Sequence, residues 1–306
     1  MKLFYAVIVL FSICSCQAQD KAENIPSEPE LKRISYISEL DGLERDYFLY
    51  LPKGYYNDST QKWPVVMHLH GNGERGNGKD DLKWVTKHGP LMEAWIQKRD
   101  FPFILVAPQL QMLGMDTLKN YIANRDSTTI PKRLNEGVPD RIPVSKTSLF
   151  KEPKTSPLPY PKEGNVRGWY LVETDLLRIV TNVQENLRGN KSKTYLTGLS
   201  YGGFGTWYMA SVHPHTFAAI APVCGWGHPK LMESIARQNI SVFCFAGERD
   251  NIIQLQHFYP GFEKLDSLNF NHYEFTIVPE VGHDVWKPVY QGEEIYSWLL
   301  NQSLND

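Results

Sequence analysis

Short apolar runs alternate with longer amphipathic stretches along most of the chain. Several of the runs are apolar at nearly every position, which is typical of strands covered on both faces. In the stretch Val172–Leu187, apolar residues recur three and four positions apart, which predicts a helix. Further helices are predicted over Gly203–Val212 and around Ile295, Trp298 and Leu299. The predicted strands are Tyr47–Leu51, Val65–His70, Phe103–Ala107, Thr194–Thr197, Ala218–Val223, Val242–Ala246 and Tyr273–Val278. This alternation predicts an α/β fold with a mostly parallel central sheet and helices on both faces.

One segment, residues 112–166, breaks the alternation. It contains seven prolines and little apolar periodicity, and residues 110–168 carry ten Lys or Arg against six Asp or Glu. A stretch of this length without regular structure is typical of a lid, a binding loop or disorder. Because it follows a predicted strand, we interpret it as a cap-like insertion on the face where parallel strands end. We expect it to control the choice of substrate and to leave the chemical step to residues outside it.

The N-terminus carries an export pattern. An apolar run of 11 residues, Leu3–Ile13, follows Lys2 and is too short to span a bilayer. A small residue then precedes Cys16, which resembles the lipobox of bacterial lipoproteins; cleavage after Ala18 is the alternative. We therefore expect a signal peptide over 1–15, a polar tether over 16–33 and one domain over 34–306. The protein is expected to be exported, either as a lipoprotein of the cell envelope or as a periplasmic or secreted protein. Contact with a membrane is expected only through a lipid on Cys16.

The composition narrows the class of protein. The 306 residues include 32 Lys or Arg and 34 Asp or Glu, so no basic surface for nucleic acid is expected. A hydrophobic fraction of 42% excludes a disordered chain. Cys224 and Cys244 lie in apolar runs and are interpreted as buried free thiols, with a disulfide as the alternative. The sequence has no Cys or His spacing of a zinc site, so no metal is predicted.

The strongest chemical signal is the motif Gly198-Leu199-Ser200-Tyr201-Gly202. It has the form G-x-S-x-G and lies between a predicted strand and a predicted helix. A sharp strand-to-helix turn lifts the serine hydroxyl out of the sheet and places it at a helix N-terminus, where N–H groups stabilise a developing oxyanion. Ser200 is therefore the predicted nucleophile, and a purely structural turn is the alternative.

A serine hydroxyl needs a base that is held by an acid. His283 follows the strand Tyr273–Val278 in a Gly-His-Asp sequence and is the predicted base. Asp250 follows the strand Val242–Ala246 and keeps the chain order Ser, Asp, His of this kind of site, with Glu248 as the rival acid.

The predicted oxyanion hole uses two backbone N–H groups. One belongs to Tyr201, directly after the serine. The other belongs to Asn72, or alternatively Gly73, in the glycine-rich loop after the strand Val65–His70. A phosphate-binding loop is a weaker interpretation, because neither GK[ST] nor a helix-opening G-x-G-x-x-G is present.

Four motifs together resemble the esterase branch of the α/β-hydrolases. That branch includes feruloyl and acetylxylan esterases of the carbohydrate esterase family 1 type, and a group labelled predicted peptidase or phospholipase/carboxylesterase. The resemblance covers about residues 34–110 and 169–300, and the insertion departs from it. The motifs are His70-Gly71-Asn72-Gly73-Glu74-Arg75-Gly76, Ala107-Pro108-Gln109, Gly198–Trp207 and Gly282-His283-Asp284-Val285-Trp286.

The resemblance implies a serine hydrolase without metal or cofactor, with Ser200, Asp250 and His283 as its triad. Together with the export pattern, it favours hydrolysis of acetyl or feruloyl esters on polysaccharides through an acyl-enzyme. Trp226 and Trp286 are candidates for stacking on a sugar or an aromatic acyl group, with ordinary packing as the alternative. A serine peptidase acting on short peptides is the second hypothesis. A glycan-binding lipoprotein without activity is the third, which the complete triad disfavours.

Overall fold

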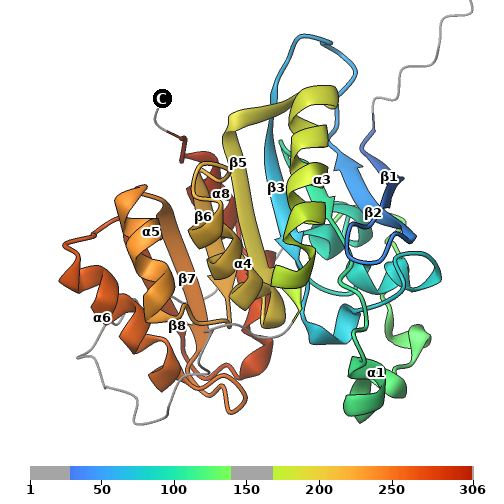
Figure 1. Ribbon diagram of the computed structural model, residues 1–306. Coiled ribbons are helices and arrows are strands. Elements are labelled where there is room, and N and C mark those ends of the chain that lie inside the picture. Colours follow the sequence, from blue (N-terminus) through green and yellow to red (C-terminus); the bar gives the residue numbers. More distant parts are fainter. Residues whose placement is uncertain (1–27, 139–167, 305–306) are drawn as a thin grey trace, which may run out of the picture.

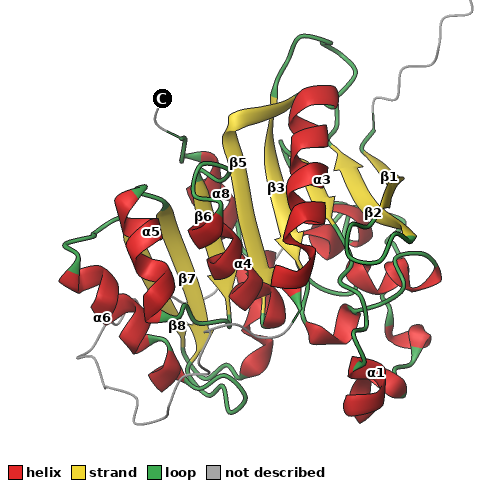
Figure 2. Cartoon of the chain, in the orientation of Figure 1, coloured by secondary structure: helices red, strands yellow, loops and turns green. Residues whose placement is uncertain are grey.

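The computed structural model describes residues 28–138 and 168–304, and in this part of the chain eight strands form one sheet (Figures 1 and 2). Their order is β1-β2-β4-β3-β5-β6-β7-β8. β2 pairs antiparallel with β1 and β4, and every other pair is parallel. The strands are β1 (Glu30–Ile37), β2 (Glu44–Leu51), β3 (Trp63–Leu69), β4 (Ile104–Ala107), β5 (Gly189–Leu199), β6 (Ala219–Val223), β7 (Ser241–Gly247) and β8 (Tyr273–Val278). The predicted α/β fold with a mostly parallel sheet is confirmed.

The first strand corrects one predicted boundary. The tether was expected to reach residue 33, but β1 begins at Glu30. As an edge strand, β1 pairs only with β2 and keeps charged side chains such as Lys32 and Arg33 in solvent. An exposed edge strand of this kind has no apolar run, so the apolar pattern could not reveal it. The expected signal peptide, Cys16 and residues 139–166 of the predicted insertion lie outside the described residues.

Helices cover the sheet. They are α1 (Met115–Leu118), α2 (Asn120–Ala123), α3 (Glu173–Asn186), α4 (Tyr201–Val212), α5 (Met232–Arg237), α6 (Tyr259–Ser267), α7 (Trp286–Gln291) and α8 (Glu294–Leu300). Shorter helical turns are η1 (Asn72–Glu74), η2 (Asp80–Thr86), η3 (Met92–Ile96), η4 (Ser127–Thr129), η5 (Trp169–Val172), η6 (Pro229–Leu231), η7 (Leu255–His257) and η8 (His283–Val285). None of the helices in the described ranges is long and apolar enough to cross a membrane.

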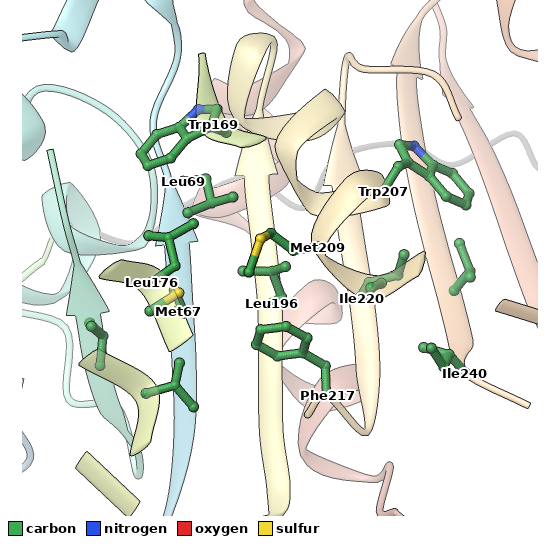
Figure 3. Packing of buried hydrophobic residues seen from close by; sticks show 14 of the residues in the cluster. Met67, Leu69, Trp169, Leu176, Leu196, Trp207, Met209, Phe217, Ile220 and Ile240 are labelled. Carbon is green, nitrogen blue, oxygen red and sulfur yellow. The ribbon is translucent and has the colours of Figure 1, made fainter. Parts of the chain in front are cut away.

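Alternate positions of the strands build two separate cores. Met67 and Leu69 of β3 pack with residues of α3, α4, α5 and α6 on one face, as Figure 3 shows for part of this cluster. Val66, directly before Met67 in sequence, points to the other face and packs with residues of η2, α7 and α8. This two-residue alternation explains why several of the strands are apolar at nearly every position. With both faces covered, the open edge at the carboxyl ends of the parallel strands is where loops can build a site.

The described part of the insertion, residues 112–138, packs against the segment that follows β3. The Lys87 ammonium donates to Thr129 Oγ1 at 2.9 Å, and the Leu134 N–H donates to the Ile96 carbonyl at 2.9 Å. Arg125 forms an ion pair with Asp81 at 3.0 Å. In Figure 1, α1 projects beyond the end of the sheet at which α4 begins. Residues 112–138 of the insertion therefore lie on the side where the parallel strands end.

Candidate active site

The turn between β5 and α4 presents the Ser200 side chain. Ser200 has φ 51° and ψ −113°, a conformation that is costly for a residue with a side chain. Tight backbone packing enforces this turn. A Cβ on Gly202 would lie 1.8 Å from the Leu69 carbonyl oxygen, and one on Gly203 would lie 2.8 Å from the Val223 carbonyl oxygen. Only glycine fits at these two positions, because the turn is clamped between the neighbouring strands β3 and β6.

Ser200, His283 and Asp250 form one hydrogen-bonded chain. Ser200 Oγ lies 3.0 Å from His283 Nε2, and His283 Nδ1 lies 2.8 Å from Asp250 Oδ2. A carboxylate only accepts hydrogen bonds, so Nδ1 carries the ring proton and Nε2 is free to accept from the serine hydroxyl. The geometry allows the imidazole to take the serine proton directly.

Asp250 is fixed by the backbone after β7. Its Oδ1 accepts from the N–H groups of Ile252 and Ile253, both at 2.8 Å, while Oδ2 faces His283. Its side chain is fully shielded from solvent. The rival acid Glu248 is exposed and accepts from the Glu280 N–H at 2.9 Å instead. Of the two candidates, the structure therefore brings Asp250 to the histidine.

The residues proposed for the oxyanion hole belong to two elements, the helix that follows Ser200 and the loop after β3. Tyr201 is the first residue of α4, and the first N–H groups of a helix have no partner within it. Asn72 begins η1, directly after Gly71. A Cβ on Gly71 would lie 2.7 Å from a methyl carbon of Leu199, so the loop runs against the residue that precedes the serine.

Two histidines, His68 in β3 and His70 in the loop that follows it, are buried. His70 Nε2 accepts from the Leu110 N–H at 2.9 Å, and its Nδ1–H donates to the Gly71 carbonyl at 2.6 Å. Burial lowers the pKa of His70 to about 3, as it does for His68, so both rings are neutral near pH 7. His70 therefore links the loop after β3 to the loop after β4.

The two candidate tryptophans have different surroundings. Trp226 is 7% exposed and packs against Phe204 and His257, which fits the packing alternative. Trp286 is half-buried and meets the His283 ring edge-on, with ring centroids 5.2 Å apart. It also borders a cavity of about 230 Å³ that His88 and Lys87 line. Of the two, Trp286 is the one beside the proposed base.

The two described cysteines, Cys224 and Cys244, are free and buried, and burial raises the pKa of both thiols. This confirms the interpretation as free thiols. Within residues 28–138 and 168–304, no three His, Cys, Asp or Glu side chains lie together as a metal ion would require.

No protein-family model matches the chain, and no curated protein sequence does either. Solved structures do match it. A thermostable esterase is 21% identical, with a TM-score of 0.59; the match covers 89% of this chain and 63% of the esterase. The chain thus spans less than two thirds of that protein's length. A CE1 ferulic acid esterase from Anaeromyces mucronatus is 22% identical, with a TM-score of 0.52, and 94% of this chain and 96% of that chain are covered.

An S-formylglutathione hydrolase from Staphylococcus aureus is 13% identical, with a TM-score of 0.54, and the match covers 90% of this chain and 99% of that one. At these identities the likeness establishes the architecture. The chain has the α/β-hydrolase fold. The resemblance drawn from the sequence motifs is confirmed at that level. An α/β-hydrolase can carry many activities, so the function must be argued from the site.

The sequence did not predict which side chains hold Asn72 in the loop after β3. Asn72 Oδ1 accepts from Arg75 Nε at 2.6 Å, and Asn72 Nδ2 donates to the Tyr121 hydroxyl at 2.5 Å. Tyr121 belongs to the insertion, which was expected to act on substrate choice alone. The structure adds a direct contact between the insertion and the proposed oxyanion hole. Because residues 72 and 121 are far apart in sequence, no local pattern could have revealed this contact.

Proposed function

We propose that this protein is a serine carboxylic ester hydrolase that acts through an acyl-enzyme on Ser200. The observation that carries the proposal is the chain Ser200–His283–Asp250, with contacts of 3.0 Å and 2.8 Å. A strained turn presents the serine, and the acid is buried and fixed by two N–H groups. This is the arrangement that activates a hydroxyl as a nucleophile.

In the proposed reaction, Ser200 Oγ attacks the ester carbonyl while its proton moves to His283 Nε2. The N–H groups of Tyr201 and Asn72 stabilise the negative oxygen of the tetrahedral intermediate. The C–O bond to the alcohol then breaks, and His283 returns the proton to the leaving alkoxide. Water attacks the acyl-enzyme by the same steps and releases the acid. Asp250 keeps Nδ1 protonated and stabilises the imidazolium between the two transfers.

For the substrate, we propose acetyl or feruloyl esters of polysaccharides. Trp286 is a partly exposed aromatic ring next to His283, and aromatic rings stack on sugar rings and aromatic acyl groups. A structural neighbour, the ferulic acid esterase from Anaeromyces mucronatus, has been solved in complex with ferulic acid, at 20% identity and a TM-score of 0.51. The export pattern in residues 1–18 would place the enzyme outside the cytoplasm, where such polymers occur.

One substrate panel tests both levels of the proposal. The purified chain is assayed on p-nitrophenyl acyl esters, on acetylated and feruloylated xylo-oligosaccharides, and on aminoacyl-p-nitroanilides. Ester turnover that exceeds anilide turnover, and that Ser200→Ala lowers by roughly 10⁴-fold or more, is expected. Turnover of the anilides alone would instead support the peptidase hypothesis. A folded parent protein that hydrolyses none of them would overturn the proposed function.

A further inference from the structure

Within the Gly71-Asn72-Gly73 stretch of the loop after β3, Asn72 is the residue whose side chain can be anchored. Gly71 and Gly73 flank Asn72 and have no side chains to anchor. The Asn72 amide is bonded at both ends, to Arg75 at 2.6 Å and to the Tyr121 hydroxyl at 2.5 Å. These two partners therefore help to set the orientation of the Asn72 peptide, beside the His70 and Arg125 side chains, which bond to the Gly71 and Gly73 carbonyls.

Arg75 also reaches the other proposed oxyanion donor. Its guanidinium carbon lies 5.0 Å from the centre of the Tyr201 ring, within the range of a cation–π contact. One guanidinium thus touches both Asn72, in the loop after β3, and Tyr201, at the start of α4. These are the two residues whose N–H groups are proposed to hold the oxyanion.

The Arg75 side chain is held in place from further sides. It is 0% exposed, and its Nη1 donates to the Gln111 carbonyl at 2.9 Å. Gly168 closes over it, since a Cβ there would lie 2.6 Å from Nη2. A planar guanidinium with several fixed partners holds its neighbours in fixed positions relative to one another, which a flexible ammonium group cannot do.

The charge of Arg75 adds to this role. Burial lowers its pKa to about 10, which leaves the guanidinium protonated at neutral pH. A fixed positive charge in a shielded site favours negative charge that develops nearby. The same side chain can therefore fix the donors and stabilise the charge that they bind.

We infer that Arg75 is a positioning residue that sets the relative placement of the Tyr201 and Asn72 N–H groups in the oxyanion hole. The inference rests on the proposed ester hydrolase function. It gives the Arg75 side chain a role in the transition state, beyond its contribution to packing.

Arg75→Lys keeps the charge but removes the planar fork, and Arg99→Lys is the matched control. Arg99 is also a buried arginine, bonded to the carbonyls of Tyr290 and Gln291 and to Glu93. Its contacts with these groups do not involve either proposed donor. Both variants are measured for kcat/KM on p-nitrophenyl acetate and for the Ki of phenylboronic acid, which forms a tetrahedral adduct with an active serine.

Arg75→Lys is expected to lower kcat/KM by roughly 10- to 100-fold and to raise the Ki of the boronic acid by a similar factor, because the oxyanion hole binds the tetrahedral state. Arg99→Lys is expected to lower Tm while changing both values by less than about twofold. If Arg75→Lys does not fold by circular dichroism, Asn72→Ala removes the same anchor and is expected to shift both values in the same direction.

Three results would overturn the inference. One is a loss of less than about threefold in kcat/KM for the folded Arg75 variant, or for Asn72→Ala where that variant replaces it. Another is a fall in kcat/KM with an unchanged Ki. The third is equal losses for Arg75→Lys and Arg99→Lys. If the parent enzyme neither hydrolyses esters nor binds the boronic acid, the proposed function itself fails, and this inference fails with it.

Discussion

The turn at Ser200 and the loop after β3 lie side by side, yet different forces hold them. At the turn, backbone packs against backbone: the Gly202 Cα is so close to the Leu69 carbonyl that a Cβ would lie 1.8 Å from its oxygen. In the loop, side chains support the backbone, and at Gly73 the backbone has room around it. A Cβ on Gly73 would have its nearest neighbour 3.9 Å away, on the Tyr121 ring.

This difference predicts how each region responds to change. A region built by backbone contact cannot accept an added atom without moving a strand of the sheet. A region supported by side chains accepts added atoms but loses its orientation when one partner is removed. Substitutions in the turn should therefore impair folding, and substitutions in the loop should impair activity.

The largest effect is expected from Gly202→Ala. The new Cβ would clash with the backbone of β3, and we expect the variant to lose more than about 4 kcal/mol of stability, which is a large fraction of the stability of a typical domain. Gly73→Ala is the matched control and is expected to stay within about 1 kcal/mol of the parent, because its Cβ meets no close atom. Urea unfolding measures both. A Gly202→Ala variant as stable as Gly73→Ala would contradict the comparison.

The next effect concerns the acid of the triad. Asp250→Asn keeps the shape but removes the negative charge beside His283, and kcat/KM on p-nitrophenyl acetate should fall by roughly 10³- to 10⁴-fold. Glu248→Gln is the control: its carboxylate is exposed and bonds to the Glu280 N–H, so a change of less than about threefold is expected. The opposite order of losses would show that Glu248 is the acid.

The parts that the sequence could predict are those that local patterns encode. The central strands have continuous apolar runs, and the glycines around Ser200 mark a turn without space for side chains. Asp250 and His283 each follow a predicted strand, so their meeting follows from the parallel sheet. The edge strand β1 has no such pattern. The contacts of Arg75 and Tyr121 join distant segments, so only the folded chain reveals them.

The side-chain-supported loop also contains a buried carboxyl group. Glu74 is 6% exposed, and burial raises its pKa to about 7, although the charges of Lys87 and Arg125 act in the opposite direction. Its Oε1 also lies 3.9 Å from His88 Nε2. Burial lowers the pKa of His88 to about 4, so this ring is neutral near pH 7. The unfolded chain releases the Glu74 proton near pH 4.5, whereas the folded protein holds it up to about pH 7.

The stability that this carboxyl group contributes is therefore present below pH 4.5 and is lost as the pH rises towards 7. Glu74→Gln removes the titration and keeps the shape. Relative to the parent, the variant should gain on the order of 3 kcal/mol between pH 4.5 and pH 7.5. The buried histidines titrate in both proteins, so their contribution to the pH dependence cancels in the difference between the unfolding free energies of parent and variant. Urea unfolding at several pH values measures it, and a difference that does not change with pH would contradict the raised pKa.

The smallest effect separates the two ways in which the insertion can act. Tyr121→Phe removes only the hydroxyl that holds Asn72, and the ring is 58% exposed, so Tm should not change. One hydrogen bond contributes about 0.5–1.5 kcal/mol, and kcat/KM should therefore fall by roughly two- to tenfold. The substrate is p-nitrophenyl acetate, which is too small to use distant contacts.

Tyr56→Phe is the control, because the Tyr56 hydroxyl bonds to Glu30 and Lys32 at the β1 edge, and its kcat/KM should equal that of the parent. An unchanged kcat/KM for Tyr121→Phe would mean that this contact of the insertion does not orient the oxyanion hole, in line with the role in substrate choice that the sequence led us to expect. A loss on this small ester would place the insertion in the orientation of the oxyanion hole.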